Sequence, residues 1–407
     1  MSDKRCLLIV GAGFEQIYAY NMAHKMGLEV VASDYDPQAP AFEYADYKLI
    51  ASTRNPEETI TAAKKFHQEQ RPIDGVMTVA NDVPLTVASV ADALGLPGIS
   101  IDAARIASDK FLMKREFEAA GVPVPRYEEI FSADDIRRLA KDGGLPLVIK
   151  PNDGRGARGV LRITQDIDFD WAFAYTKKTS ESGQVLAEAF VNGPQLSSES
   201  MIYNGKCYTA AVSHRNYELL DTYAPYIIEN GGVIPADLSE IDLKSIDRVI
   251  HDAAKAMGVE RGTVKGDIVL SEDGPVVIEL AARLSGGGLC TDQIPLSRGV
   301  DLVEQTIRLA LGEELDVNDL IPQDLCKIGI RYIFPKPGVV QSVQGFDDLD
   351  KLEWISKKKL LVEVGDIIED VVSHPSRVGF VHAVGQSYDE AEHRAISAVE
   401  QVVIKTA

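Results

Sequence analysis

The sequence predicts an α/β domain at the N-terminus, followed by an α+β region that ends in a small domain. Two observations carry this prediction. The first 50 residues follow the order strand, glycine turn, helix, strand, which begins a doubly wound sheet. From about residue 147 the apolar runs are longer, and turns such as Asn204-Gly205 and Asp273-Gly274 separate them, which is typical of antiparallel hairpins.

The composition is that of a globular chain with more than one core. The 407 residues, 45% hydrophobic and 26% charged, suffice for two or three domains. A formal net charge of -20 argues against a nucleic-acid partner, because binding to phosphate backbones needs clustered basic residues. Four scattered cysteines without a Cys-x-x-Cys pair predict neither a zinc site nor a disulfide framework. Without a signal-peptide pattern or 18 consecutive apolar residues, we expect no membrane partner and a cytoplasmic location.

The N-terminal domain is predicted over residues 1–121. A strand over Leu7–Val10 leads through Gly11-Ala12-Gly13 into a helix over Glu15–Lys25, and a second strand ends at Asp34. Further strands are expected at Tyr47–Ile50 and Gly75–Val79, and further helices near Pro56–Gln68 and Leu85–Leu94. Pro123 and Pro125 then enforce an extended linker.

The rest of the chain is predicted to contain longer strands and two covering helices. The helices are expected near Leu243–Met257 and Asp301–Leu311, and an amphipathic helix near Tyr388–Val403 closes the chain. The strands are expected at Leu147–Lys150, Val185–Glu188, Ser197–Tyr203, Cys207–Ser213, Val264–Leu270 and Pro275–Leu280.

A lysine followed by a glycine-rich loop indicates that the chain handles a polyphosphate. Lys150 ends an apolar run and precedes residues 153–160, Asp-Gly-Arg-Gly-Ala-Arg-Gly-Val. The lysine offers a point charge, the glycines let backbone N–H groups approach phosphates, and Arg155 and Arg158 add positive field. The loop is not a Walker A motif, since no Gly-Lys-Ser/Thr follows it. An ordinary hairpin with a charged turn is the competing interpretation.

Two acids on one hairpin predict a divalent metal site. Asp267 begins one strand and Glu279 ends the next, so the two carboxylates come side by side and repel unless a cation lies between them. Mg²⁺ is the natural occupant, because it prefers oxygen ligands and is normally shared with phosphate oxygens. A pair of solvated strand-end acids is the alternative. Downstream, Arg283 in a glycine-rich segment is a candidate to hold a transferring phosphoryl group or a substrate carboxylate.

In this order along the chain, these motifs resemble those of the ATP-grasp enzymes. The narrower resemblance is to the carboxylate-amine ligases that include the L-amino-acid ligases. The ATP-grasp part also resembles that of the carbamoyl phosphate synthase large chain. The resemblance covers essentially the whole chain. It implies an ATP-grasp fold with a pre-ATP-grasp domain at 1–121, a two-lobed ATP-grasp domain at 122–318 whose mobile lid spans about 123–188, and a small C-terminal domain at 319–407.

The resemblance also assigns site residues. Asp267 and Glu279 match ligands of Mg²⁺ or Mn²⁺, and Glu188 opens the hinge whose backbone and acid receive adenine. Two positions depart from the family pattern: Gln195 replaces a ribose-binding glutamate, and Ala281, which cannot ligate a metal, replaces an asparagine. The ATP-binding residues implied are Lys110, Lys150, Gly154, Arg155, Gly156, Ala157, Gly159, Val160, Glu188, Phe190, Val191 and Gln195.

The activity implied is ATP-dependent amide formation through an acyl phosphate, with release of ADP and phosphate. Arg283 is the catalytic candidate. The partners expected are a small-molecule carboxylate and an amine, and a homodimer is the assembly expected from similar enzymes. The residues expected to border the substrates are Glu229, Arg283, Ser285, Gly286 and Gly287.

Three alternatives stay open from the sequence. Glycinamide ribonucleotide synthetase-like or carboxylase-like activity would use the same ATP chemistry with another acceptor. An NAD-dependent dehydrogenase would use Gly11-x-Gly13 and Asp34, although Gln16 replaces the third small residue of that fingerprint. A non-catalytic ATP-binding protein is suggested only by Gln195 and Ala281.

Overall fold

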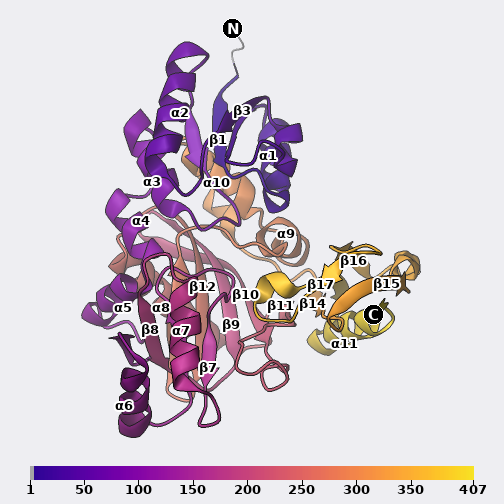
Figure 1. The fold of residues 1–407 in the computed structure, drawn as a ribbon. Coiled ribbons are helices and arrows are strands. Elements are labelled where there is room, and N and C mark those ends of the chain that lie inside the picture. The colour runs from indigo at the N-terminus through magenta and orange to yellow at the C-terminus, as the bar shows by residue number, and fades with distance from the viewer. Residues whose placement is uncertain (1–3) are drawn as a thin grey trace.

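The N-terminal part folds around a four-stranded parallel sheet in a computed structural model, which describes residues 4–407 (Figure 1). The strand order is β3-β2-β1-β4, and β1 is buried along its whole length because it lies inside the sheet with helices on the faces. The predicted doubly wound start is confirmed. Its elements are β1 (Cys6–Val10), α1 (Ile17–Lys25), β2 (Glu29–Asp34), β3 (Tyr47–Ile50), α2 (Pro56–Glu69), β4 (Gly75–Met77), α3 (Pro84–Leu94) and α4 (Ile101–Ser108).

Two elements of this part differ from their predicted bounds by two residues, and three others differ by one residue. Strand β4 ends at Met77 rather than Val79, because Val79 forms an isolated bridge with Leu284 and accepts a hydrogen bond from the Gln16 side chain. The first α-helix begins at Ile17, after a 3-10 turn over Phe14–Gln16. The hydrogen bond from Gln16 to Val79 ties the glycine turn after β1 to a segment 63 positions away.

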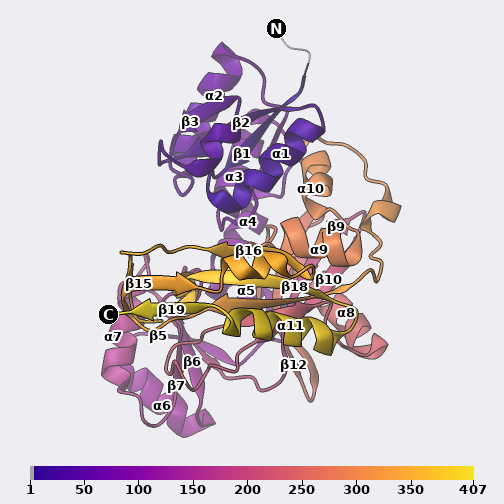
Figure 2. The ribbon, with the colours of Figure 1, turned by 90° about the vertical axis from the view of Figure 1, so that its right-hand side faces the viewer.

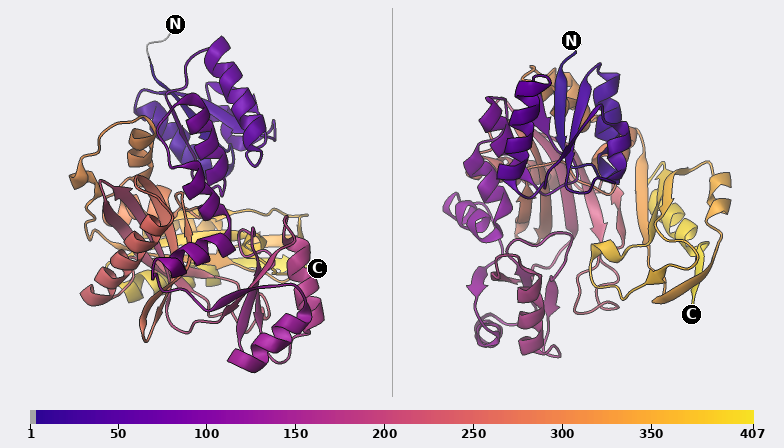
Figure 3. Two further views of the ribbon diagram at one scale, coloured as in Figure 1. Left: turned by 90° about the vertical axis from the view of Figure 1, so that its left-hand side faces the viewer. Right: turned by 45° about the horizontal axis from the view of Figure 1, so that its top comes forward.

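A second, smaller lobe is built on an antiparallel sheet of order β5-β8-β6-β7. Helices α6 and α7 cover it, and the apolar faces form one core that includes Ile136, Ile149 and Ala172. Figure 3 shows this lobe, in magenta, on the opposite side of the molecule from the N-terminal sheet. The elements that lead into and form the lobe are α5 (Lys110–Ala119), β5 (Tyr127–Ile130), α6 (Ala133–Gly143), β6 (Leu147–Pro151), β7 (Leu161–Ile163), α7 (Phe169–Thr179) and β8 (Val185–Ala189).

The centre of the molecule is an eight-stranded antiparallel sheet of order β13-β12-β9-β10-β11-β14-β18-β16. Strands from beyond residue 318 extend it, so the sheet runs across the predicted boundary between the second and third domains. Its strands are β9 (Gln195–Tyr203), β10 (Lys206–Asn216), β11 (Gly231–Ile234), β12 (Gly262–Ser271), β13 (Gly274–Ala281), β14 (Lys327–Ile333), β16 (Ile355–Leu360) and β18 (Gly379–Gly385). The helices of this region are α8 (Glu240–Ala256), α9 (Ile294–Arg298) and α10 (Leu302–Ala310).

The C-terminal region adds a three-stranded sheet and one helix (Figure 2). The sheet consists of β17 (Ile367–Ile368), β15 (Gly338–Gln344) and β19 (Val403–Thr406), and α11 (Tyr388–Glu400) packs on β14 and β18. The helix predicted to reach Val403 therefore ends at Glu400, because Val403 pairs with Gln344 in the sheet.

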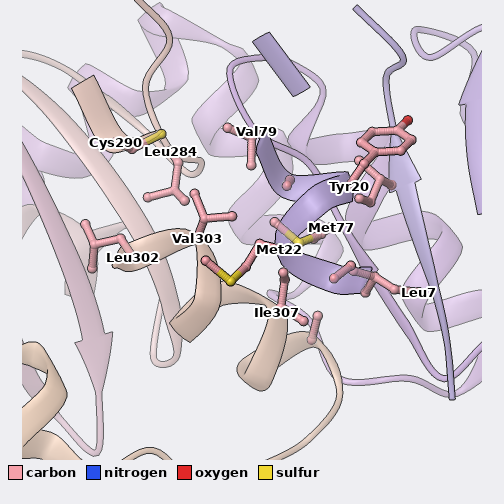
Figure 4. Close-up of a cluster of buried hydrophobic side chains, with 14 of the residues drawn as sticks. Leu7, Tyr20, Met22, Met77, Val79, Leu284, Cys290, Leu302, Val303 and Ile307 are labelled. Atoms are coloured by element: carbon pink, nitrogen blue, oxygen red, sulfur yellow. The ribbon is translucent and has the colours of Figure 1, made fainter. Parts of the chain in front are cut away.

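Helix α10 fastens the central region to the N-terminal sheet. Figure 4 shows Val303 and Ile307 of this helix among Leu7, Met22 and Met77, all of them members of one buried apolar cluster. The N-terminal sheet and the central region therefore share one packed apolar core. Within residues 4–407, none of the helices is both long and apolar enough to cross a membrane.

Candidate active site

The glycine-rich loop after β6 is held in a left-handed path over a cavity. Gly156, Ala157 and Gly159 all have positive φ, 60°, 58° and 71°, a conformation that glycine adopts easily and alanine does not. The Lys110 ammonium donates to the carbonyl of Gly154 at 2.9 Å, so the loop is tied to the start of α5. The N–H groups of Arg158 and Val160 donate hydrogen bonds within the loop, and its left-handed path is of the kind that phosphate-binding loops use.

A cavity of about 310 Å³ lies under this loop, between the small lobe and the central sheet. Its lining combines apolar residues, among them Val148, Leu220 and Ile227, with the charged residues Lys110, Lys150, Arg155, Asp267 and Glu279. A cavity with both kinds of lining suits a planar base with a polyphosphate chain. The predicted ATP-binding residues that line it are Lys110, Lys150, Gly154, Arg155, Gly156, Ala157, Val160, Glu188, Phe190, Val191 and Gln195.

Gly159 does not line this cavity. A Cβ at this position would lie 1.9 Å from the Thr179 hydroxyl, and the Gly159 carbonyl accepts a hydrogen bond from Thr176 at 2.9 Å. The glycine is therefore needed for close packing of the loop against α7.

The floor of the cavity contains a buried charge cluster, Lys114–Glu188–Lys150. Glu188 Oε1 lies 2.8 Å from the ammonium groups of both lysines, and none of the three side chains is more than 5% exposed. Burial would raise the pKa of Glu188, but the two lysines hold it below its ordinary value. The carboxylate of Glu188 is thus paired with two lysines, and Glu188 lines the cavity together with residues 189–191. The contact of this segment with adenine stays a prediction.

The two predicted metal carboxylates face each other across the β12–β13 hairpin. Asp267 pairs directly with Glu279 in the strand register, next to a bulge. Asp267 is bound by Lys265 and by Arg215 at 2.5 Å, which hold its pKa below the ordinary range although burial acts the other way. Glu279 lies 3.2 Å from Lys110.

This donor set fits Mg²⁺ or Mn²⁺ shared with a nucleotide. Mg²⁺ is usually held by one or two carboxylates together with phosphate oxygens and waters, which matches two adjacent carboxylates beside a phosphate loop. Within residues 4–407 no group of three or more His, Cys, Asp and Glu side chains could hold a metal without such help. The phosphate oxygens are therefore an expected part of the metal site.

A second cavity, of about 900 Å³, lies between the central sheet, the N-terminal sheet and the C-terminal region. All five residues predicted to border the substrates, Glu229, Arg283, Ser285, Gly286 and Gly287, line it. Its walls carry nine lysine and arginine side chains against four aspartates and glutamates, in a chain whose net charge is -20. The local excess of positive charge favours anionic reactants.

The two cavities meet at a set of residues that line both. Arg283 is bound to Asp82 at 2.5 Å, and Arg215 and Arg377 both bind Glu229, at 2.6 and 3.3 Å. Burial would raise the pKa of Glu229, but the two arginines hold it at about 2, so it is ionised at neutral pH. The residues shared by both cavities are Asp82, Arg155, Gly156, Arg215, Lys265, Arg283 and His374.

Three consecutive segments of the chain match described families. Residues 20–98 match the ATP-grasp N-terminal domain, residues 107–287 the ATP-grasp domain, and residues 331–407 the L-amino acid ligase C-terminal domain 2. The chain belongs to the ATP-grasp superfamily. It is an ATP-dependent carboxylate-amine ligase of the L-amino acid ligase type.

Individual relatives and one solved structure are similar over most of the chain. The chain is 27% identical over 335 residues to an uncharacterized protein, y4rH, of Sinorhizobium fredii, covering 81% of this chain and 68% of that protein. It is 23% identical over 330 residues to the alanine–anticapsin ligase of Bacillus subtilis, covering 74% of this chain and 68% of the relative. The fold is that of an L-amino acid ligase from Bacillus licheniformis, with a TM-score of 0.83, 21% identity and full coverage of both chains.

The glycine turn after β1 of this ATP-grasp protein is contacted by its own side chains, those of Gln16 and Asp34. The Gln16 side chain lies against the turn, 2.8 Å from where a Cβ on Gly13 would be. The Asp34 carboxylate accepts hydrogen bonds from the backbone N–H groups of Ala12 and Asp36, at 3.0 and 3.1 Å. The acid that a dehydrogenase would offer to ribose therefore closes the turn itself, which removes the support for that alternative.

Sequence reasoning missed several residues that the ATP-grasp fold brings to the site. Arg215 follows Ser213-His214 in a polar run at the end of β10, and Lys265 lies two residues before Asp267 on the same strand face. The positive charge of these two residues could have indicated that they belong to the site. Asp82 and His374 had none, because each is brought in by a loop far away in the sequence. The residues missed are Asp82, Lys114, Glu199, Arg215, Lys265, His374 and Arg377.

Glu199 behind the site gives a testable pH dependence. It is fully buried on β9 and accepts hydrogen bonds from the backbone N–H of Ser285, at 2.9 Å, and from its hydroxyl. Burial raises the pKa of Glu199 to about 7, although the Ser285 hydrogen bonds act in the opposite direction. At a pH below the ordinary glutamate pKa, the Glu199 carboxyl is protonated in both the folded and the unfolded state. As the pH rises toward 7, only the folded state keeps this proton, so the free energy of unfolding falls.

Between pH 4.5 and pH 8 this titration should lower the free energy of unfolding of the wild type by about 3 kcal/mol, and Glu199→Gln should remove that pH-dependent loss. Urea unfolding at several pH values checks it, because the stability difference between variant and wild type should grow with pH and vanish near pH 4. A difference that is constant with pH would contradict the assignment of the raised pKa to Glu199.

Proposed function

We propose that the chain joins an amino acid to an amine through an acyl phosphate. The observation that carries this proposal is the junction of the two cavities, where four basic side chains, Arg155, Arg215, Lys265 and Arg283, line both the nucleotide cavity and the larger cavity. A phosphoryl group that passes from one cavity to the other crosses this junction, and its developing charge is stabilised there.

The first step balances without a protein nucleophile. An oxygen of the substrate carboxylate attacks the γ-phosphorus of ATP, and the bond from that phosphorus to the bridging oxygen breaks, so ADP leaves with the electron pair. Lys110, Lys150 and the backbone of the glycine-rich loop orient the phosphates, and Arg283 holds the carboxylate against them. Asp267 and Glu279 would hold Mg²⁺ or Mn²⁺, which when bound neutralises charge on the phosphate oxygens.

The second step takes place in the larger cavity. The amine nitrogen attacks the acyl carbon, the bond from that carbon to the phosphate oxygen breaks, and phosphate leaves while the amine loses one proton to solvent. Ser285, Gly286 and Gly287 line one wall, where Glu199 accepts a hydrogen bond from the Ser285 N–H and Glu15 accepts one from the Gly287 N–H. Glu229 balances the charges of Arg215 and Arg377 in the same cavity. The excess of positive charge in this cavity supports reactants that carry carboxylates.

The experiment that tests this function measures ADP release against a matrix of amino acids offered as carboxylates and amines, with Glu279→Gln as the blank. Mass spectrometry of the products identifies the amide. We expect one or more pairs to release ADP and amide in equal amounts. Nucleotide binding without ADP release for any pair would instead support a non-catalytic ATP-binding protein, and bicarbonate-dependent release without an amino acid would support the carboxylase-like alternative.

A further inference from the structure

A short segment of the C-terminal region, residues 371–377, touches the glycine-rich loop. The backbone N–H of His374 donates a hydrogen bond to the carbonyl of Gly156 at 3.1 Å. A Cβ placed on Gly156 would lie 3.6 Å from Pro375, in ordinary van der Waals contact. The loop that covers the phosphates is therefore seated on a part of the chain some 220 positions away in sequence, which belongs to the third predicted domain.

The same segment is fixed to the wall of the larger cavity. Arg377 donates to the backbone carbonyl of Glu229 at 2.8 Å, lies 3.3 Å from its carboxylate, and stacks 3.6 Å from the centre of the Tyr332 ring. The backbone of His374 is bound to Gly156, and Arg377, three residues later, is bound to Glu229. The His374 side chain is consequently held in place relative to both cavities.

His374 lies at the junction with unused hydrogen-bonding capacity. It lines both cavities, and its Nε2 is enclosed without a hydrogen-bond partner among residues 4–407. Burial, together with the positive charge of Arg377, holds the pKa of His374 at about 3, so the ring is neutral and carries one N–H donor and one acceptor. A buried polar group without a partner is destabilising, and a ligand that pairs with it removes that penalty.

We propose that His374 donates a hydrogen bond to the phosphoryl group as it passes from the nucleotide to the substrate carboxylate, and that seating of Gly156 on the His374 backbone couples closure of the glycine-rich loop to this contact. The inference rests on the proposed function, which places phosphoryl transfer at the junction. It assigns the C-terminal region a direct part in the reaction, in addition to its structural role in extending the central sheet.

The seating of the loop is tested by hydrogen exchange on the wild-type protein, which needs no turnover. A non-hydrolysable ATP analogue with Mg²⁺ should slow amide exchange in residues 153–159 and in residues 371–377 together. Slowing in residues 153–159 alone would overturn the coupling between the two segments.

The hydrogen bond to the phosphoryl group is tested with His374→Ala, His374→Asn and His374→Gln. His374→Ala should lower kcat by about 10²-fold, the effect of losing one donor to a developing oxyanion, while KM for ATP changes by less than about threefold. Asn or Gln, whose side-chain N–H groups can replace the donor, should recover about tenfold of that loss. The matched control is His393→Ala, which removes an exposed histidine of α11 in the same region.

The results distinguish the role of His374 from the proposed amide-forming function. An unchanged kcat in His374→Ala would overturn the role of His374 and leave the proposed function intact. A thermal unfolding midpoint measured for every variant identifies a merely structural loss, which would affect ATP affinity as well as kcat and would not be recovered by Asn or Gln. If the wild type forms no amide with any pair, the proposed function fails and the phosphoryl contact fails with it, whereas the exchange result still decides the seating of the loop.

Discussion

Replacing Glu279 with glutamine is expected to lower ATP-dependent amide formation by on the order of 10³-fold. The Glu279 carboxylate faces Asp267 in the strand register and lies 3.2 Å from the Lys110 ammonium. Glutamine keeps the size of the side chain but removes the charge that a divalent cation and Lys110 both need, so two contacts to the phosphates weaken together. The measurement is ADP release under saturating substrates, with Mg²⁺ varied.

The control for Glu279→Gln is Glu272→Gln, which neutralises an exposed acid in the turn of the same hairpin and should keep wild-type activity. The metal dependence distinguishes a binding defect from misfolding. Excess Mg²⁺ or Mn²⁺ should restore part of the activity of Glu279→Gln, because a weakened site is filled by mass action. Equal activity and an unchanged Mg²⁺ midpoint in the variant would exclude Glu279 as a metal ligand.

The parts of the site that sequence predicts are those formed within a short stretch of chain. The β12–β13 hairpin brings Asp267 and Glu279 together because a tight turn sets the register as far as the Ile268–Val277 pair, and a bulge next to that pair places Asp267 opposite Glu279. The glycine-rich loop likewise follows directly from β6, and eleven of the twelve ATP-binding residues predicted line one cavity. Gly159 is the exception, since a glycine required by packing and a glycine required by a ligand look alike in sequence.

The parts that sequence does not predict depend on contacts between distant segments. Arg283 is identifiable as a functional arginine, but its partner Asp82 lies 201 positions earlier and no local pattern connects them. The extension of the central sheet by β14, β18 and β16 is of the same kind, because strand pairing across separate domains leaves no periodic signal. The ion pairs of Glu188 are also beyond sequence-based prediction, because its partners Lys114 and Lys150 lie on α5 and β6, separate elements that only the fold brings together.

The second large effect is expected from that cluster. Glu188→Gln should destabilise the fold by about 3–5 kcal/mol, because it leaves the ammonium groups of Lys114 and Lys150 buried without their shared counter-charge. Urea unfolding measures the change. The control is Glu181→Gln, which breaks the exposed ion pair with Arg54 and should cost less than about 1 kcal/mol.

A second variant tests whether uncompensated charge is the cause. Adding Lys114→Met to Glu188→Gln removes one of the two unpaired ammonium groups, so the double variant should be more stable than Glu188→Gln alone. A double variant less stable than either single variant would show that lost packing, rather than charge, dominates.

The pH dependence of Glu188→Gln gives an independent check on the same cause. Burial lowers the pKa of Lys114 to about 8 in the wild type, against the opposing effect of Glu188. Without Glu188 that pKa falls further, and between it and the ordinary lysine pKa the unfolded state binds more protons than the folded state, so stability rises with pH. The stability deficit of Glu188→Gln should therefore shrink as pH rises toward 8 and stay constant above it, where the wild-type Lys114 has lost its proton too, whereas a loss caused by packing alone would be the same at every pH.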